Sequence, residues 1–136
     1  MTLSPRQQDL IDGLQFIEDA QERLTAVVER ARSSPPLDER FRTDDFRVHG
    51  CQSRVWVTRS ELASAMFRGD SDSPLVRALV VLTCDFFSDP DPAALASLRA
   101  DADPVALLGL DSHISGTRRA GLAAVRARLR ELSPTS

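Results

Sequence analysis

Three pairs in the second half of the chain place a capping side chain directly before a proline that is followed by residues suited to a helix. The pairs are Ser73-Pro74, Asp91-Pro92 and Asp103-Pro104. Serine and aspartate side chains accept hydrogen bonds from the free N–H groups of a helix start, and proline lacks an N–H that would go unused there. These pairs therefore predict helices over Pro74–Phe87, Pro92–Ala100 and Pro104–Leu108.

Apolar residues at helical spacing predict three further helices, two at the beginning of the chain and one at its end. Their ranges are Pro5–Phe16, Asp19–Arg32 and Thr117–Leu132. The second of them ends at Ser33-Ser34-Pro35-Pro36, because consecutive prolines cannot continue a helix.

Between these helical regions the residues are typical of β-strands. Phe46 and Val48 form one expected strand, Val55 to Val57 a second and Ala65–Arg68 a third, with Gly50-Cys51-Gln52-Ser53 as the turn after the first. We expect an α+β fold, in which a small three-stranded antiparallel sheet packs against helices. With 136 residues the chain has the length of one domain, so we assign residues 1–136 to a single domain.

Cys51 is the first candidate for chemistry, because a cysteine beside a glycine in a turn can be exposed. The nearby cations Arg47 and Arg54, together with His49, would lower the pKa of its thiol and favour the reactive thiolate. The alternative is a small buried residue that adjoins a turn, since free cysteine is often buried. Cys84 lies in an apolar helix, and we expect it to belong to the core.

The composition excludes several classes of function. Two cysteines and two histidines, with no close cysteine pair, do not suit a structural zinc site or an iron-sulfur cluster, so we expect no metal and no cofactor. A net charge of −3, with basic residues mixed among acidic ones, argues against a nucleic-acid partner. The sequence contains no membrane-spanning apolar run and no secretory signal, so we expect no membrane and a cytoplasmic location.

Three segments, in the same order along the chain, resemble those of the SufE family of sulfur acceptors. The run Gly50-Cys51-Gln52-Ser53-Arg54-Val55-Trp56 is similar to the family signature GCQSxVW, and Gly69-Asp70-Ser71-Asp72 to its GDSD segment. The segment from Leu110 to Leu122 is similar to LxxHLxPxRxxGL, with Gly116 in place of the family's proline. The stretch from Thr58 to Phe67 is also short for the family.

The resemblance implies a persulfide carrier with the α+β fold that SufE shares with IscU-type scaffolds. Cys51 is implied to accept sulfur from a pyridoxal-phosphate (PLP)-dependent, SufS-like cysteine desulfurase. The protein would stimulate that enzyme, deliver sulfur to a SufBCD-like scaffold and be no enzyme by itself, as a monomer or weak homodimer. Asp72 is implied to hold the cysteine loop, and Arg118 to act in docking. The loop residues that would accompany Cys51 are His49, Gly50, Gln52 and Ser53.

Three alternatives stay open at this point. A CsdE-like carrier would perform the same chemistry with a different desulfurase. A scaffold for iron-sulfur clusters would share the fold but would need more thiolate ligands than Cys51 alone. A thiol hydrolase would pair Cys51 with His49 or His113 as its base.

Overall fold

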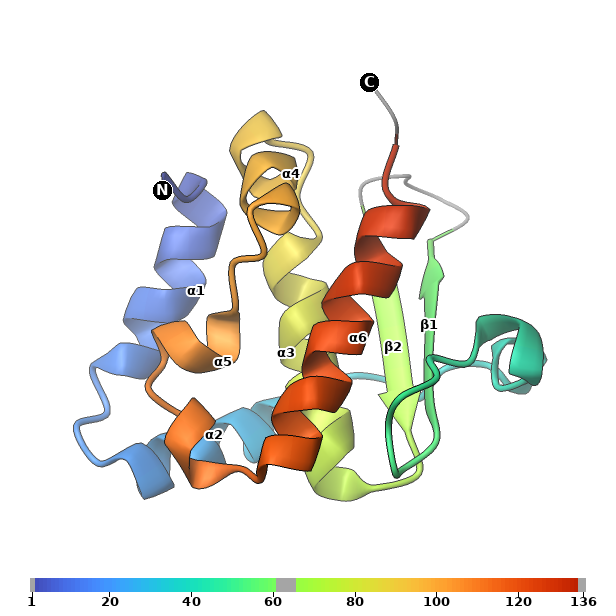
Figure 1. Ribbon diagram of the computed structural model, residues 1–136. Coiled ribbons are helices and arrows are strands. Elements are labelled where there is room, and N and C mark those ends of the chain that lie inside the picture. The colour runs from blue at the N-terminus through green and yellow to red at the C-terminus, as the bar shows by residue number, and fades with distance from the viewer. Residues whose placement is uncertain (1, 61–65, 135–136) are drawn as a thin grey trace.

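Helix α3 (Pro74–Phe87) lies at the centre of the molecule and contacts the other main elements. The computed structural model describes residues 2–60 and 66–134. Every residue of α3 from Ala78 to Cys84 is buried, as expected of a helix that is apolar on all sides. Helix α2 (Ala20–Arg32) packs on one side of α3 and the sheet on another, while α6 (Gly116–Leu132) lies across both the helix and the sheet (Figure 1).

The helix starts predicted from the capping pairs are confirmed. Helix α3 begins at Pro74, α4 (Pro92–Arg99) at Pro92 and α5 (Pro104–Leu107) at Pro104, and in each case the preceding side chain accepts a backbone hydrogen bond. The other helices end within one residue of the expected bounds. They are α1 (Pro5–Gln15), α2 (Ala20–Arg32) and α6 (Gly116–Leu132), with a short 3-10 turn η3 (Asp111–His113) before α6.

The described sheet has two strands, β1 (Val55–Arg59) and β2 (Phe67–Ser71). They pair antiparallel, with Val55 opposite Ser71 and Arg59 opposite Phe67. Strand β2 lies against α3, and β1 lies against α6. The fold is therefore α+β, with helices packed on a small antiparallel sheet, as predicted.

The strand expected at Phe46 and Val48 does not form, so the prediction of a three-stranded sheet is wrong and the described sheet has two strands. Asp44–Phe46 forms a 3-10 helix, η2, which follows another short one, η1 (Glu39–Phe41). In the described residues, the expected pairing with β1 is reduced to two contacts. One is an isolated bridge between Arg47 and Trp56, and the other is a hydrogen bond from the Val48 N–H to the Val55 carbonyl at 2.8 Å. The chain enters the turn at 49–50 directly afterwards, which leaves no length for a strand.

The strand expected over Ala65–Arg68 is shifted toward the C-terminus. Strand β2 runs from Phe67 to Ser71, and Ala65 lies outside the described residues. Gly69 lies inside the strand, at a point where β2 approaches α3 closely. A Cβ at position 69 would lie 2.6 Å from Cγ1 of Val80, so the close approach of β2 to α3 excludes any side chain.

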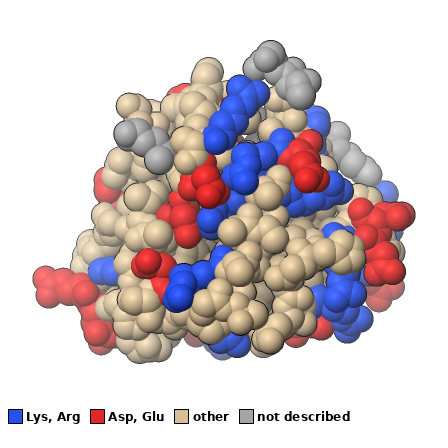
Figure 2. All heavy atoms as spheres, in the orientation of Figure 1, with Lys and Arg blue, Asp and Glu red and all other residues tan. Residues whose placement is uncertain are grey.

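Helix α6 is anchored to the rest of the molecule by ion pairs along its second half. The buried Arg126 side chain contacts Asp101 at 2.8 Å and Asp103 at 3.3 Å, and Arg130 also contacts Asp101. Basic and acidic side chains are accordingly interspersed on the face shown in Figure 2. These contacts fix α6 relative to the segment between α4 and α5.

No helix in the described part of the chain combines the length and the apolar character that crossing a membrane requires.

Candidate functional site

The Cys51 loop, which we define as residues 48–54, connects η2 to β1 and lies against α6. Gly50 adopts a φ of +99°, a conformation that glycine reaches without strain, and this directs the chain back toward the helix. Cys51 is half-buried, and its thiol donates a hydrogen bond to the Gly121 carbonyl of α6, with 3.5 Å between sulfur and oxygen. The thiol therefore points toward the body of the molecule.

A cavity of about 50 Å³ lies beside the Cys51 thiol. We call it the Cys51 cavity. It is lined by loop residues, by β1, and by side chains of α3 and α6, namely Cys51, Gln52, Ser53, Val55, Val76, Leu79, Val80, Thr117, Arg118, Gly121, Leu122 and Val125. One water molecule needs roughly 10–15 Å³ of such space. The cavity therefore has room for an additional atom of the size of sulfur.

The environment of Cys51 raises the pKa of its thiol. Burial is the largest cause, because it disfavours the charged thiolate, and the positive charge of Arg47 opposes it only in part. The expectation that neighbouring cations make this a thiol of lowered pKa is therefore wrong for the position that the structure shows. The reason is that the loop folds inward, which brings desolvation that the local sequence does not reveal.

Asp72 connects the Cys51 loop to the start of α3. Its carboxylate accepts a hydrogen bond from the backbone N–H of Arg54 at 3.1 Å and another from Nε of Arg54 at 3.0 Å. These bonds lower the pKa of Asp72, with the side-chain bond from Arg54 as the largest cause. Asp72 thus lies where a residue that restrains the loop would lie.

The two arginines at the start of α6 have different surroundings. Arg118 is exposed and lines the Cys51 cavity. Arg119 donates hydrogen bonds to the carbonyls of Asp111 and Ile114, at 2.9 and 2.8 Å. Helix α6 begins at Gly116, and the Ser115 side chain caps it by accepting a hydrogen bond from the Arg118 N–H at 3.1 Å. Arg118, and not Arg119, is therefore placed to meet a group that approaches the thiol.

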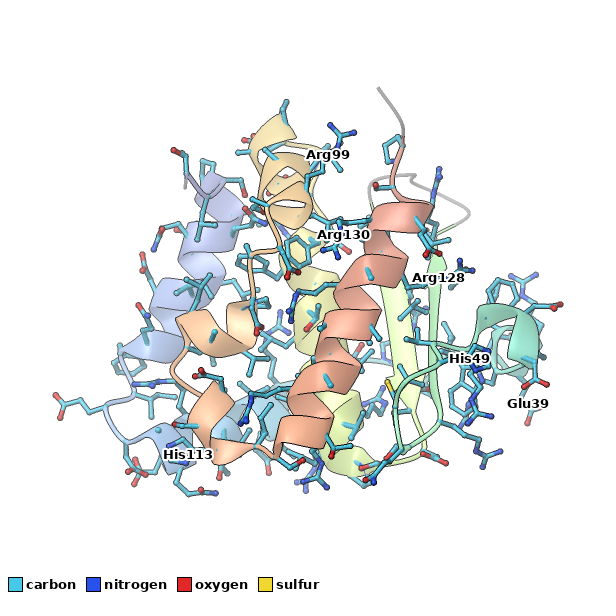
Figure 3. The ribbon with its side chains drawn as sticks, in the orientation of Figure 1. Glu39, His49, Arg99, His113, Arg128 and Arg130 are labelled. Atoms are coloured by element: carbon cyan, nitrogen blue, oxygen red, sulfur yellow. The ribbon has the colours of Figure 1, made fainter. Side chains whose placement is uncertain are left out.

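The histidines do not join Cys51 in one site. His49 is exposed and lines a separate surface depression with Arg47, Arg128 and Glu131, among others, instead of the Cys51 cavity. His113 lies in η3, and Figure 3 shows it at the edge of the molecule opposite to His49. Gln52 and Ser53, in contrast, line the Cys51 cavity as loop residues.

Cys84 is fully buried, and burial raises the pKa of its thiol strongly. This confirms the expectation of a core residue. Within residues 2–60 and 66–134, no group of three or more His, Cys, Asp or Glu side chains is placed to hold a metal ion.

Sequence reasoning assigned no role of their own to two residues, one that anchors the segment leading to Asp72 and one that contacts Cys51. Asp70 is 3% exposed, and its carboxylate accepts hydrogen bonds from the Leu37 and Ser71 N–H groups and from Nε of Arg77. The backbone of Gly121 contacts the Cys51 thiol, which donates a hydrogen bond to its carbonyl. The signals were present, as an aspartate two residues before Asp72 and as a glycine inside a predicted helix, but the sequence indicates the contact partner of neither residue.

Comparison with known proteins shows the family of this chain. The model of the SufE family, an Fe-S metabolism associated domain, matches residues 8–133, which include the whole site. An uncharacterized SufE-like protein of Rhizobium etli is 34% identical over 127 residues, covering 90% of this chain and 85% of the relative. An uncharacterized SufE-like protein of Rhizobium meliloti is 29% identical over 126 residues, covering 89% of each chain. The SufE-like protein 1, chloroplastic/mitochondrial, of Arabidopsis thaliana is 31% identical over 123 residues, covering 88% of this chain and 32% of the plant protein.

Proposed function

The chain belongs to the SufE family of Fe-S metabolism associated proteins, and from that premise we propose that it accepts persulfide sulfur on Cys51. The donor is a PLP-dependent cysteine desulfurase of the SufS type, and the sulfur is delivered to a SufBCD-like scaffold for iron-sulfur cluster assembly. The protein acts as a carrier and as an activator of the desulfurase, and it catalyses no reaction by itself. In this role the protein is a monomer or a weak homodimer.

The observation that carries the proposal is the pairing of one accessible thiol with a cavity beside it. Cys51 is half-buried next to about 50 Å³ of space, whereas Cys84 is enclosed in the core. The outer sulfur of a persulfide on Cys51 fits into that space, where the surrounding apolar side chains would keep solvent reductants away. A thiol that serves only as a packing residue needs no such space.

The chemistry is a thiolate exchange that needs no cofactor on this chain. The Cys51 thiol loses its proton, and the thiolate attacks the outer sulfur of the desulfurase persulfide. A new S–S bond forms on Cys51 while the S–S bond of the donor breaks, and the desulfurase cysteine leaves as a thiolate. Sulfur is transferred without an external oxidant or reductant.

The raised pKa of Cys51 fits a carrier that reacts only with its partner. Burial keeps the thiol protonated in the free protein, so its intrinsic reactivity is low. Binding of the desulfurase would draw the loop outward and remove the desolvation. Arg118, an exposed residue that lines the Cys51 cavity, would pair with a carboxylate of the partner.

The distribution of the histidines favours a carrier over a thiol hydrolase. A hydrolase would require a base within hydrogen-bond reach of the thiol, and His49 lines a different depression. A CsdE-like pathway would use the same Cys51 chemistry, so the choice between the two desulfurases is a question of partner specificity.

The two free cysteines suit a compartment that keeps thiols reduced, and we propose the cytoplasm. The name of the plant relative refers to chloroplasts and mitochondria and describes that protein.

The test is to incubate the protein with a SufS-type desulfurase, or with the desulfurase that serves CsdE-like carriers, and isotopically labelled cysteine, without reductant. Peptide mass spectrometry then locates the added sulfur, with Cys51→Ala and Cys84→Ala as matched variants. We expect label on Cys51 in the wild-type protein and in Cys84→Ala, and none in Cys51→Ala. Label on Cys84 alone would overturn the assignment of the acceptor.

A further inference from the structure

Gly121 occupies an unfavourable place for a glycine, in the interior of the long helix α6. Glycine is among the poorest helix formers, because it loses more backbone freedom on folding than other residues. Its neighbours Ala120, Ala123 and Ala124 show that the same stretch of helix otherwise uses alanine. A compensating contact at position 121 is therefore expected.

The contact is with Cys51. A Cβ at position 121 would lie 3.1 Å from the Cys51 sulfur, closer than such atoms ordinarily approach, and 3.7 Å from both Cα and Cβ of Cys51. The sulfur is thus the one atom of Cys51 that an alanine would displace. The carbonyl of the same residue accepts the thiol hydrogen bond at 3.5 Å, so the bare backbone both admits the thiol and binds it.

The contact between Gly50 of the loop and Ala124 of α6 differs from that between Cys51 and Gly121. A Cβ at Gly50 would meet the Cβ of Ala124 at an ordinary 3.6 Å, so Gly50 is required by its φ of +99° and not by the space above the helix. Of these two glycine positions, only Gly121 is therefore one where a side chain would meet the other element more closely than ordinary contact allows.

We propose that Gly121 is a positioning residue for sulfur transfer, which holds the Cys51 thiol in its inward, protonated position until a partner draws the loop out. A hydrogen bond from the thiol to a carbonyl favours the neutral form, because a thiolate has no proton to donate. The missing side chain allows the sulfur to lie deep enough for this bond. This role of Gly121 rests on the proposed function, but the experiment that tests it requires no desulfurase.

The test measures the alkylation rate of Cys51 by iodoacetamide as a function of pH, read at the Cys51 peptide by mass spectrometry. We expect Gly121→Ala to alkylate about tenfold faster near neutral pH, with the midpoint of the rate profile at lower pH than in wild type. Gly13→Ala is the matched control, because Gly13 is also helical and a Cβ there meets nothing within 4 Å. An unchanged rate and midpoint, or a slower rate, would overturn the proposal.

A second measurement separates this role from general loss of folding. In a Cys51→Ala background the close contact is absent, so Gly121→Ala should raise the thermal midpoint, as Gly13→Ala does in either background. With Cys51 present, Gly121→Ala should lower the midpoint instead. An equal change in both backgrounds would show that Gly121 does not respond to the thiol, and the proposal would fail while sulfur acceptance by Cys51 could still hold.

Discussion

Arg54 and Asp72 are joined by three hydrogen bonds that connect the Cys51 loop to the start of α3. The Asp72 carboxylate accepts from the backbone N–H and from Nε of Arg54, and the Asp72 N–H donates to the Arg54 carbonyl at 3.3 Å. The Arg54 guanidinium also lies over the Trp56 ring, with 5.7 Å to its centroid. Arg54, the last residue of the Cys51 loop, thus contacts both Asp72 and Trp56.

Replacing Asp72 with alanine should loosen this connection and expose Cys51 more often. We expect the alkylation rate of Cys51 to rise about threefold, a modest change because an exposed ion pair contributes little. Asp9→Ala, on the exposed side of α1, is the control and should leave the rate unchanged. If Asp72→Ala alkylates at the wild-type rate, the restraint on the loop lies elsewhere.

The pH dependence of Cys51 alkylation should reveal the raised pKa. Burial keeps the folded thiol protonated to higher pH, so its rate should still be rising where that of the urea-unfolded protein has levelled. Arg47→Gln removes the charge that favours the thiolate and should move the midpoint further upward. Arg32→Gln, whose partner is Glu29, serves as the control and should leave the midpoint in place. A folded midpoint below that of the unfolded protein would contradict the inward position of the thiol.

Arg118→Ala should reduce stimulation of the desulfurase about tenfold, because one charge-assisted contact to a partner carboxylate contributes roughly 1.5–3 kcal/mol. Alkylation of free Cys51 should stay near the wild-type rate. Arg119→Ala is the matched variant. It should leave stimulation intact but lower stability by about 0.5–1.5 kcal/mol in urea unfolding, since it loses its hydrogen bonds to Asp111 and Ile114. Equal stimulation by Arg118→Ala and wild type would remove the docking role.

Asp70 and Asp72 should have opposite roles, although one residue separates them. Asp70→Asn breaks a buried ion pair with Arg77, whose N–O distance is 2.9 Å, and should lower the free energy of unfolding by about 2–3 kcal/mol. Its effect on Cys51 alkylation under native conditions should be small. Asp72→Asn should leave the urea midpoint unchanged and raise the alkylation rate. A stability loss shared by both variants would show that the two carboxylates act as one structural unit.

The helices could be predicted from the sequence alone, because their signals are local. A serine or aspartate before a proline accepts a hydrogen bond from a free N–H group in the first turn of the helix. The helix starts at Pro74, Pro92 and Pro104 could therefore be predicted without knowledge of the fold. The burial of Cys84 followed from its apolar neighbours in the same way. The expected strand at Phe46 and Val48 was wrong, because a strand depends on the length available for pairing, which the adjoining turn removed.

The chemistry of Cys51, in contrast, depends on how the loop packs in the folded protein. Its cationic neighbours in the sequence indicated a lowered pKa, whereas the packing of the loop on α6 buries the thiol and raises the pKa. The roles of Arg118 and Arg119, adjacent in the sequence, are separated by where each guanidinium lies. Gly121 is 70 residues from Cys51 along the chain and within hydrogen-bond reach of its sulfur in space. Desolvation and close contact depend on distances between elements, and no local pattern of residues specifies those distances.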